Sequence, residues 1–423
     1  MTELTLDRRE RLSNPWVVLF SLLGISVFNF ADRYLLTGLV GPIKAEFGLD
    51  DAFIGLLMGP AFVALYVVAG VPIARLADRS SRIRIIAAGC VVWSCCTIAT
   101  GFATGPLSLA LARVGVGVGE AAFAAPAYSL LSDYFRPERR PAAFAILALA
   151  TYIGQIAGQG GGPAIAAAYD WRTAYFVMGA PGILLALIAL ALVREPPRPF
   201  AAGAAHTVSF REVVGRLAEA PSYWLMMAGF GLGMLSGVSF GFWGPELFTR
   251  VYAMDPVAAK SAFALNFGLA GLVGMLGFGA LASRLARRDE AWPLRLAAIS
   301  MAGATALILA VAWADSYELA LLLAIPCGLL GGGWSAGVIS LLQHLLPAHY
   351  RATATALFLA VATLVGFALG PWLTGALSSA LGNDGTALRM GLTIVMPTGF
   401  VGAACAWLAV RRIEADRARL AAA

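Results

Sequence analysis

Residues 106–131 read PLSLALARVGVGVGEAAFAAPAYSLL, an apolar run long enough to cross a lipid bilayer as an α-helix. Two charged residues, Arg113 and Glu120, interrupt this run. Because they are nearly two helical turns apart, they lie on one helix face, about 10.5 Å apart along the axis. A charge at mid-bilayer costs roughly 2.5–3.5 kcal/mol on insertion scales, so such residues face a partner or a water-filled cavity. The stretch therefore predicts a membrane helix that carries a functional site.

Three glycines alternate with valine between these charges, at Gly115, Gly117 and Gly119. A dinucleotide-binding loop requires the spacing G-x-G-x-x-G between a strand and a helix, and this stretch has neither that spacing nor that setting. Small residues in membrane helices let neighbouring backbones approach closely. We therefore expect tight helix packing at these glycines.

The composition of the whole chain also indicates a membrane protein. The sequence is 60% hydrophobic and 13% charged, with a mean hydropathy of +0.79. These values are far from those of soluble globular proteins and predict an all-α polytopic membrane protein. Apolar windows separated by glycine and proline predict twelve transmembrane helices. The predicted spans are residues 15–40, 52–74, 83–103, 106–131, 141–169, 172–193, 222–249, 257–282, 293–314, 317–345, 351–379 and 387–411.

The positive charges are distributed unevenly between the two sides of these spans. If the N-terminus is cytoplasmic, most of the 30 Lys and Arg residues fall in cytoplasmic segments, and Arg33 and Arg113 lie within spans. The residues on the opposite side are Lys44, Arg172, Arg250, Lys260 and Arg389. By the positive-inside rule both termini are cytoplasmic, and we expect the chain in the plasma (inner) membrane. The net charge of +6 thus reflects topology, and no nucleic-acid partner is expected.

The chain also repeats itself. The segment ARLADRSSR, residues 74–82, follows the second span, and the related GALASRLAR, residues 279–287, follows the eighth. Two similar halves joined by a linker are typical of transporters with parallel repeats, in which substrate binds between the halves. We predict six-helix bundles at residues 1–193 and 222–423. The linker, residues 194–221, is proline-rich and predicts an amphipathic surface helix near Phe210.

The whole chain resembles the major facilitator superfamily of transporters. The loop after the second span resembles the superfamily signature, with Asp78, Arg79 and Arg82 in place. Ala74 and Ser81 replace two of its usual glycines. The resemblance implies a fold of two pseudo-symmetric six-helix bundles that works by alternating access.

Within that superfamily, two motifs resemble the Spinster family. The first is Asn29-Phe-Ala-Asp-Arg-Tyr34, which organic-anion symporters share, and the second is the more specific Gly-Glu-Ala at residues 119–121. Spinster proteins are similar to proton-linked exporters of sphingosine-1-phosphate and lysophospholipids. The resemblance therefore implies a coupling site formed by Asp32, Arg33, Arg113 and Glu120.

Helix geometry allows these four residues to meet. Counting 1.5 Å per residue from each helix end places Asp32, Arg33 and Arg113 in the outer half of the membrane and Glu120 near its middle. Asp32 can then pair with Arg113, whereas an arginine that reaches Glu120 must bridge roughly two turns. A carboxylate beside an arginine stays ionised, and one that loses its partner in a dry cavity takes up a proton. The alternative is a static ion-pair network that only holds the two helices together.

Several other residues have both a functional and a structural interpretation. The residues predicted to form a cytoplasmic gate are Asp78, Arg79, Arg82, Asp133 and Arg139. For Arg82 alone, ordinary positive-inside charge is the simpler interpretation. Glu246, near the outer end of the seventh span, is expected to be a solvated rim residue. Residues 154–163, GQIAGQGGGP, predict a close-packing seam in preference to a bending point.

The substrate prediction depends on the asymmetry between the halves. The first half carries all four charges of the predicted site, and the second half offers aromatic residues with few carboxamides. The predicted substrate-binding residues are Asn29, Arg33, Arg113, Phe240, Trp243, Asn266 and Trp334. For each aromatic residue, a packing or lipid-facing role is the alternative. The inventory fits a single-chain amphipathic lipid, such as a lysophospholipid or a sphingosine-1-phosphate analogue, better than a sugar.

Two other function classes are alternatives for this sequence. The same arginines suit a proton-coupled symporter of a small organic anion. A membrane-embedded enzyme or receptor has less support, because no histidine lies in a predicted span and no metal-ligand spacing occurs. We therefore expect no enzymatic activity and no cofactor or metal. The proton gradient would be the energy source, and the protein a monomer surrounded by membrane lipids.

Overall fold

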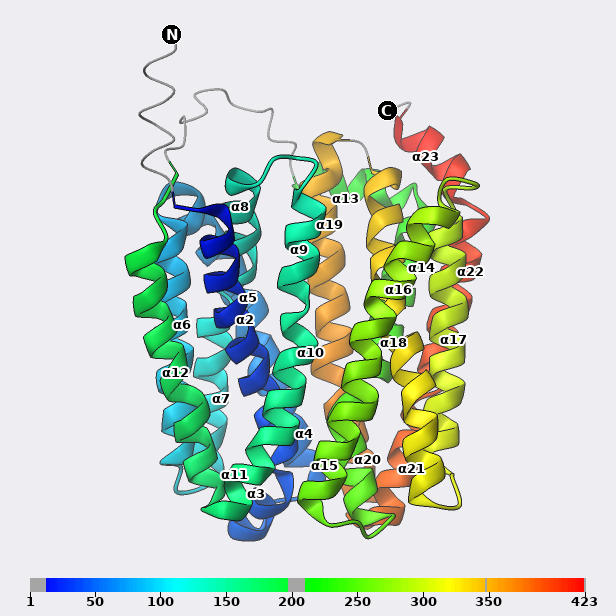
Figure 1. Cartoon of the computed structure of the whole chain (residues 1–423). Coiled ribbons are helices and arrows are strands. Elements are labelled where there is room, and N and C mark those ends of the chain that lie inside the picture. Colours follow the sequence, from blue (N-terminus) through cyan, green and yellow to red (C-terminus); the bar gives the residue numbers. More distant parts are fainter. Residues whose placement is uncertain (1–12, 197–209, 347, 422–423) are drawn as a thin grey trace. The chain divides into compact units, whose positions relative to one another are not determined.

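The computed structural model describes residues 13–196, 210–346 and 348–421 of the chain (Figure 1). Within these residues every regular element is a helix, and twelve helical spans are long and apolar enough to cross a membrane. The spans are Pro15–Gly38, Asp51–Ala77, Arg82–Gly101, Pro106–Tyr134, Arg140–Ala168, Trp171–Leu192, Pro221–Arg250, Pro256–Leu285, Trp292–Ala312, Tyr317–Ile339, Thr353–Ala380 and Gly385–Val410. The predicted all-α fold with twelve spans is confirmed, with boundaries that differ by a few residues.

The helices form two compact units. Unit 1 comprises Met1–Leu49 and Ala61–Phe200, and unit 2 comprises Asp50–Pro60 and Ala201–Ala423. Unit 2 therefore includes a segment from the first half of the chain. This division into units does not test the residue ranges predicted for the two six-helix bundles, so those ranges stay a prediction.

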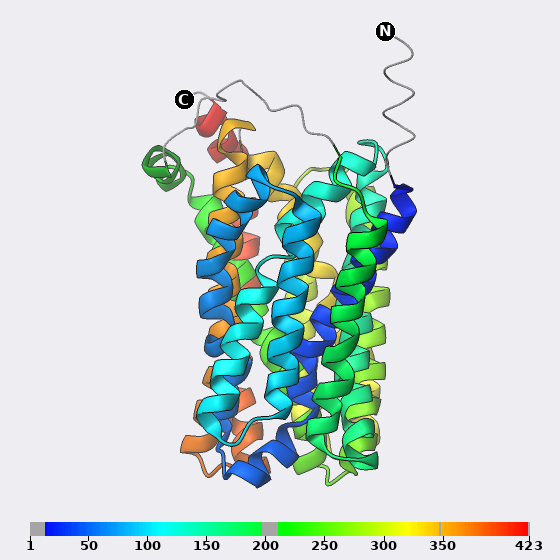
Figure 2. The ribbon, with the colours of Figure 1, turned by 90° about the vertical axis from the view of Figure 1, so that its left-hand side faces the viewer.

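Unit 1 contains most of the first six spans, several of which are broken into consecutive helices. Its helices are α2 (Pro15–Gly38), α3 (Val40–Phe47), α5 (Pro60–Arg79), α6 (Arg82–Gly101), α7 (Pro106–Glu120), α8 (Ala124–Tyr134), α9 (Arg140–Ala148), α10 (Ala150–Gln155), α11 (Gly162–Ala168) and α12 (Trp171–Leu192). α6 packs against both α7 and α12, and α2 packs against α10 and α12 (Figures 1 and 2).

Unit 2 contains the last six spans together with α4 (Asp51–Met58). Its other helices are α13 (Phe210–Ala218), α14 (Pro221–Arg250), α15 (Pro256–Phe263), α16 (Ala270–Leu285), α17 (Trp292–Ala312), α18 (Tyr317–Leu345), α19 (Ala348–Thr363), α20 (Gly370–Ala380), α21 (Gly385–Val395), α22 (Thr398–Val410) and α23 (Ile413–Ala421). α13 lies in the linker where the amphipathic helix was predicted, with Val213 and Leu217 buried. α4 packs on α20, where a Cβ on Gly55 would lie 2.7 Å from the carbonyl oxygen of Pro371.

Local sequence signals explain where the spans begin. α2 starts at Pro15, and the side chain of Asn14 accepts a hydrogen bond from the backbone N–H of Trp16 at 2.9 Å. Proline suits the first helical turn because that N–H has no helical partner, and asparagine is a favoured N-cap. Asp170 caps α12 in the same way through the N–H of Thr173.

Three spans contain a π-helical turn, at Ile156–Gly161, Ala264–Leu269 and Leu364–Leu369. The first falls inside the glycine-rich segment of the fifth span. A Cβ on Gly158 would lie 2.3 Å from the carbonyl oxygen of Ala31, so this segment packs tightly against α2. The close-packing interpretation of that segment is confirmed, and a local widening of the helix accompanies it.

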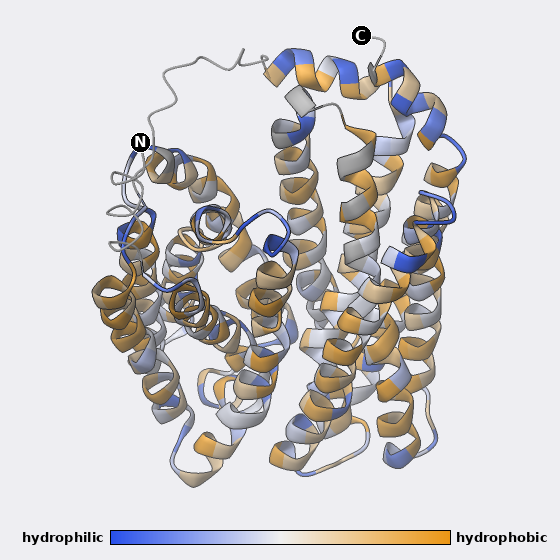
Figure 3. Cartoon of the chain, turned by 45° about the horizontal axis from the view of Figure 1, so that its top comes forward, coloured by the Kyte–Doolittle hydropathy of each residue, from blue (hydrophilic) through white to orange (hydrophobic). Residues whose placement is uncertain are grey.

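The outer surfaces of the helices are apolar. Large hydrophobic side chains such as Val68, Leu107 and Leu322 are more than half exposed in the protein alone. Figure 3 shows hydrophobic residues along the helices and hydrophilic residues concentrated near helix ends and loops. This distribution is what contact with lipid requires, because lipid tails are as apolar as the side chains they meet.

Candidate functional site

The four charged residues grouped by the sequence lie together in unit 1. α2 carries Asp32 and Arg33, and α7 carries Arg113 and Glu120. Nη1 of Arg113 lies 3.9 Å from Oδ1 of Asp32, and Nη2 of Arg33 pairs with Oε2 of Glu120. Asp32, Arg113 and Glu120 are at most 4% exposed. Each arginine therefore faces one carboxylate from the other helix; we call these four residues the charged cluster.

Glycines on α7 bring its backbone close to its neighbours. A Cβ on Gly117 would lie 2.2 Å from the carbonyl oxygen of Phe62 on α5, and one on Gly119 would lie 2.6 Å from the backbone nitrogen of Trp93 on α6. Real Cβ atoms do not approach other atoms so closely, so only glycine fits without a backbone shift. The predicted packing role of these glycines is confirmed.

The break in the fourth span begins directly after the charged cluster. α7 ends at Glu120, and three non-helical residues separate it from α8. The backbone N–H of Phe123 still donates to the carbonyl of Glu120 at 3.1 Å. Glu120 thus lies at a helix end, where a tighter i→i+3 hydrogen bond takes the place of the regular helical one.

Thr97 on α6 is part of the charged cluster's surroundings and was missed by the sequence analysis. Its hydroxyl donates to Oδ2 of Asp32 and also lies 2.9 Å from the carbonyl oxygen of Trp93. A hydroxyl has one proton and two lone pairs, so Thr97 can donate to an ionised Asp32 or accept from a protonated one. When Asp32 is protonated, the Thr97 hydroxyl accepts from Asp32 and donates its own hydrogen bond to the carbonyl oxygen of Trp93. No sequence signal distinguished Thr97 from the other span threonines.

Aromatic rings surround the guanidinium of Arg33. Its Cζ lies 4.6 Å from the ring centroid of Phe62, 5.2 Å from that of Phe30 and 5.7 Å from that of Tyr66. These distances are typical of cation–π contacts, which stabilise a cation where water is scarce. These partners could not be predicted from the sequence, because aromatic residues are common in membrane helices.

Several buried atoms around the charged cluster lack a hydrogen-bond partner in the described part of the chain. They are Oδ1 of Asp32, Oε1 of Glu120, Nε and Nη1 of Arg113 and the hydroxyl of Tyr175 on α12. Tyr175 interacts electrostatically with both Arg113 and Asp32. Buried polar atoms are nearly always satisfied in proteins, so this group of exceptions makes the charged cluster the candidate functional site.

The other predicted substrate residues have different surroundings. Asn29 is buried on α2, one helical turn before Arg33, and Asn266 is half-buried in a π-helical turn of unit 2. Phe240 and Trp243 are fully buried, and the indole of Trp243 donates to the carbonyl of Pro371 at 2.9 Å. This burial excludes a lipid-facing role for both in this structure.

Trp334 is also buried in unit 2. It packs against Phe230 with ring centroids 4.9 Å apart. Packing thus occupies the rings of all three predicted aromatic residues, and their binding of substrate stays a prediction.

Comparison with known proteins identifies the family. Residues 22–368 match the model of the Major Facilitator Superfamily. The chain belongs to this superfamily. It is 32% identical to an MFS-type efflux pump of Mycolicibacterium smegmatis, over 95% of this chain and 94% of the pump.

Spinster proteins are also among the relatives of this superfamily member. Human protein spinster homolog 1 is 29% identical over 93% of this chain and 80% of its own length. A crystal structure of a bacterial homologue of the human lysosomal transporter Spinster, inward-facing and unoccupied, superposes with a TM-score of 0.83 at 25% identity. That match covers 95% of this chain and 98% of the other. The family and the fold are those of secondary transporters rather than of enzymes.

The superfamily signature loop leads into a cluster of ion pairs around Arg82, within unit 1. Arg82 at the start of α6 is 1% exposed, and its guanidinium pairs with Asp133 at 2.6 Å and with Glu195 at 2.7 Å. A third donor reaches the hydroxyl of Ser129 at 3.0 Å. The guanidinium of Arg82 is therefore buried and ion-paired, and the interpretation of Arg82 as positive-inside charge stays a prediction. Glu195 was missed because it lies beyond the sixth predicted span.

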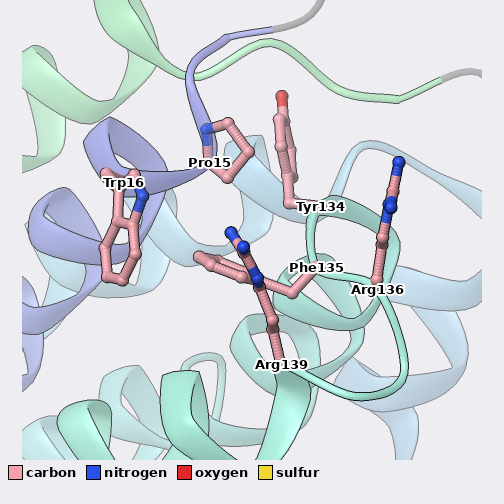
Figure 4. Close-up of a pocket in the computed structure, with 6 residues that line it drawn as sticks. All are labelled: Pro15, Trp16, Tyr134, Phe135, Arg136 and Arg139. Atoms are coloured by element: carbon pink, nitrogen blue, oxygen red, sulfur yellow. The ribbon is translucent and has the colours of Figure 1, made fainter.

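Of the other predicted gate residues, Arg79 and Arg139 have no ion pair with the Arg82 cluster in the described part of the chain. Arg79 is exposed, and Arg139 lines a separate cavity (Figure 4). The side chain of Asp78 lies outside the described residues. The gate role of all five residues stays a prediction.

Glu246 is buried, so its prediction as a solvated rim residue is wrong. It is 2% exposed and pairs with Lys260 on α15 and with Arg250 on its own helix, each at 2.9 Å. Arg250 also pairs with Asp51 on α4 at 2.8 Å, and the hydroxyl of Ser378 donates to Asp51 at 2.6 Å. α14 extends to Arg250 and packs against α15, which removes Glu246 from the rim. This cluster belongs entirely to unit 2.

An exposed ion pair lies between α3 and α12 in unit 1. Glu46 forms a bidentate pair with Arg172, with N–O distances of 2.6 and 2.7 Å, and accepts from the indole N–H of Trp171 at 2.6 Å. Hydrogen bonds from Arg172 and then Trp171 lower the pKa of the Glu46 carboxyl to about 2. Charge-assisted hydrogen bonds favour the ionised form of a carboxylate.

Proposed function

We propose that the protein is a proton-coupled secondary transporter that works by alternating access and moves a single-chain amphipathic lipid. The observation that supports this most strongly is the pairing of Arg33 with Glu120 inside an aromatic surrounding. The protonation state of Glu120, the carboxylate paired with this cation, then determines whether the cation is available to an anionic head group. The proposal rests on competition between the Glu120 carboxylate and an anionic head group of the substrate for the guanidinium of Arg33.

The competition works through protonation of Glu120. While Glu120 is ionised, it holds Arg33 by a charge-assisted contact. A protonated Glu120 attracts the guanidinium much less, so Arg33 becomes available to a phosphate or carboxylate on the substrate. An anionic head group and the Glu120 carboxylate therefore exclude each other at Arg33.

Asp32 and Arg113 supply a second step. Their charged atoms are 3.9 Å apart, too far for a hydrogen bond, and a small movement of α7 relative to α2 would bring them into contact. Thr97 stabilises Asp32 in either protonation state by reversing the direction of its hydrogen bond. A conformational change that alters this separation is thereby linked to the proton occupancy of Asp32.

The lipid part of the proposal is supported by the apolar surroundings of the cation and by the resemblance of the two sequence motifs to the Spinster family. A small organic anion held by the same arginines is the alternative. The distinguishing experiment is competition in proteoliposomes by compounds that share one phosphate-containing head group and differ in chain length. Each buried CH₂ contributes about 0.8 kcal/mol, so inhibition should strengthen roughly fourfold per CH₂ until the binding site is full.

All compounds must stay below their micelle concentrations in this assay. If short water-soluble anions compete as well as long-chain ones, the lipid substrate is excluded and the organic-anion transporter takes its place. We also propose that both termini face the cytoplasm and that the protein resides in the inner membrane, as the charge distribution predicts.

A further inference from the structure

Unit 1 has a cavity at the end where α2 begins and α8 ends (Figure 4). Its volume is about 400 Å³. It is lined by Pro15, Trp16, Tyr134, Phe135, Arg136 and Arg139. The first residues of one span and the residues just after another form its wall, so the cavity lies at the boundary between membrane and water. The charge distribution predicts that this boundary is the cytoplasmic one.

The two arginines of this cavity are available to a ligand. Both are exposed, and neither guanidinium has a hydrogen bond or an ion pair within the described residues. Arg82 in the same unit, by contrast, is buried and paired with two carboxylates. Figure 4 shows the Arg139 side chain beside Phe135, with its guanidinium toward Pro15. The cavity thus combines two available cations with an aromatic floor.

An apolar path leads from this cavity along α2. Trp16 is half-exposed and packs edge-on against Phe135, with centroids 5.7 Å apart. On its other side Trp16 stacks on Phe20 at 6.3 Å, and Phe20 is 58% exposed one turn deeper in the span. A ligand with a head group at the arginines would therefore find apolar surface for a tail in the direction of the membrane interior.

Unit 2 contains a cavity of about 640 Å³ with the same components. It is lined by Ala218, Pro221, Trp224, Leu225, Leu408, Arg411 and Arg412. Here too a span begins with proline followed closely by tryptophan, and two arginines face the cavity from a neighbouring segment. The indole of Trp224 donates to the carbonyl of Leu217 at 2.9 Å, which fixes its ring.

The arginines of this second cavity are also available. Arg411 and Arg412 are exposed, and the described part of the chain provides no ion pair for either. Leu408 lies one turn deeper on α22 and is 46% exposed. The order from the water side to the membrane side is again cations, tryptophan and exposed apolar surface.

We propose that each cavity binds an anionic phospholipid of the surrounding bilayer, with the phosphate at the arginine pair and an acyl chain along the exposed apolar helix face. Arginine suits this role because its planar fork binds phosphate oxygens in pairs, and interfacial tryptophan is favoured at the depth of the head groups. These sites are separate from the charged cluster, so the proposal does not depend on the transported substrate.

Native mass spectrometry of the detergent-solubilised full-length protein tests the proposal. The protein is exposed to phosphatidylglycerol and, separately, to phosphatidylcholine of the same chain length. We expect two phosphatidylglycerol molecules to be retained in preference to phosphatidylcholine. The double variants R136Q/R139Q and R411Q/R412Q should each lose one of them, with affinity for that lipid reduced roughly tenfold or more.

The matched control is R84Q/R288Q, which removes two exposed arginines outside both cavities. It should retain both lipids, and an equal loss in this control would overturn the proposal in favour of general charge attraction. Unchanged retention by both cavity variants would also overturn it. Glycerol phosphate is the second control, because displacement of the lipid by equimolar glycerol phosphate would show that the cavities bind a free phosphate and not a lipid.

Discussion

Arg33 pairs with the carboxylate of Glu120, and aromatic rings lie around its guanidinium. Cation–π contacts hold the guanidinium in place whether or not that carboxylate is charged. In the proposed mechanism, the proton occupancy of Glu120 changes what Arg33 can bind without removing Arg33 from its position. At the residue scale, we therefore propose Glu120 as the proton switch and Arg33 as the group on which it acts.

Neutralising the carboxylates should remove the response to pH. We expect Glu120→Gln and Asp32→Asn each to abolish the pH dependence of transport while the protein stays folded, because an amide keeps the shape of the acid but exchanges no proton. The measurement is the initial transport rate of purified variants in proteoliposomes across a pH series. Wild-type pH dependence in both variants would remove the two residues from the coupling mechanism.

Arg113 should be less tolerant of change than either carboxylate. Arg113→Ala leaves Asp32 buried without its cation, which typically costs about 3–5 kcal/mol. Arg113→Lys should restore stability only in part, because lysine lacks the planar fork. Thermal unfolding in detergent measures both effects, and a fully stable alanine variant would contradict the pairing of Arg113 with Asp32.

Thr97 provides a sharper residue-scale test. Thr97→Val has nearly the same shape but leaves Oδ2 of Asp32 without its donor, which costs about 1–3 kcal/mol. Thr97→Ser keeps the hydroxyl and is the matched control. We expect valine, and not serine, to shift the pH profile of transport. Identical profiles for the two variants would show that the hydroxyl has only a packing role.

At the element scale, the position of α7 depends on glycines. Gly117→Ala would place a Cβ 2.2 Å from a backbone oxygen of Phe62, so a helix must move. Such overpacking typically costs about 1–3 kcal/mol. The control is Gly70→Ala on α5, where a Cβ meets no atom within 4 Å and the change should be neutral or stabilising. Equal unfolding temperatures for the two variants would contradict the packing.

The ion pair between α3 and α12 predicts a pH effect on stability. The pKa of Glu46 is lowered to about 2 by its hydrogen bonds with Arg172 and Trp171, from an ordinary value of 4.5. Its contribution is therefore fully present above about pH 4.5 and lost as the pH falls toward 2. Glu46→Gln should lower the unfolding temperature at pH 7, and the difference from wild type should shrink toward pH 3. A difference that is constant with pH would show that the carboxylate charge is not involved.

The sequence predicted elements better than it predicted contacts. Hydropathy located all twelve spans, and the cost of burying charge pointed to Arg113 and Glu120. Thr97 and Phe62 were not predicted, because uncharged and aromatic residues are common in membrane helices. Glu246 is buried beside Lys260 of α15 and Arg250, and Arg250 is also paired with Asp51 of α4, which is remote in sequence. Tertiary packing determines which helix faces contact each other, and these contacts cannot be read from a single sequence.

At the scale of the whole molecule, topology is the first prediction to test. In a variant whose native cysteines are replaced, Glu138→Cys should react with a membrane-impermeant thiol reagent only from the cytoplasmic side. Asp384→Cys should react only from the opposite side. Both positions are exposed. Inside-out vesicles expose the cytoplasmic side to the reagent, and intact cells expose the opposite side. Reversed labelling would overturn the orientation derived from the charge distribution.

The central claim, that Glu120 links proton binding to substrate movement through Arg33, is tested most directly by comparing two transport modes of Glu120→Gln. The measurement follows a labelled lysophospholipid in proteoliposomes, first in counterflow at equal pH on both sides and then under an imposed pH gradient. Wild-type protein should show both counterflow and gradient-driven accumulation. Glu120→Gln should retain counterflow and lose accumulation, since it can bind and exchange substrate but has no proton to exchange at position 120. Gradient-driven accumulation by Glu120→Gln at the wild-type level would contradict the account.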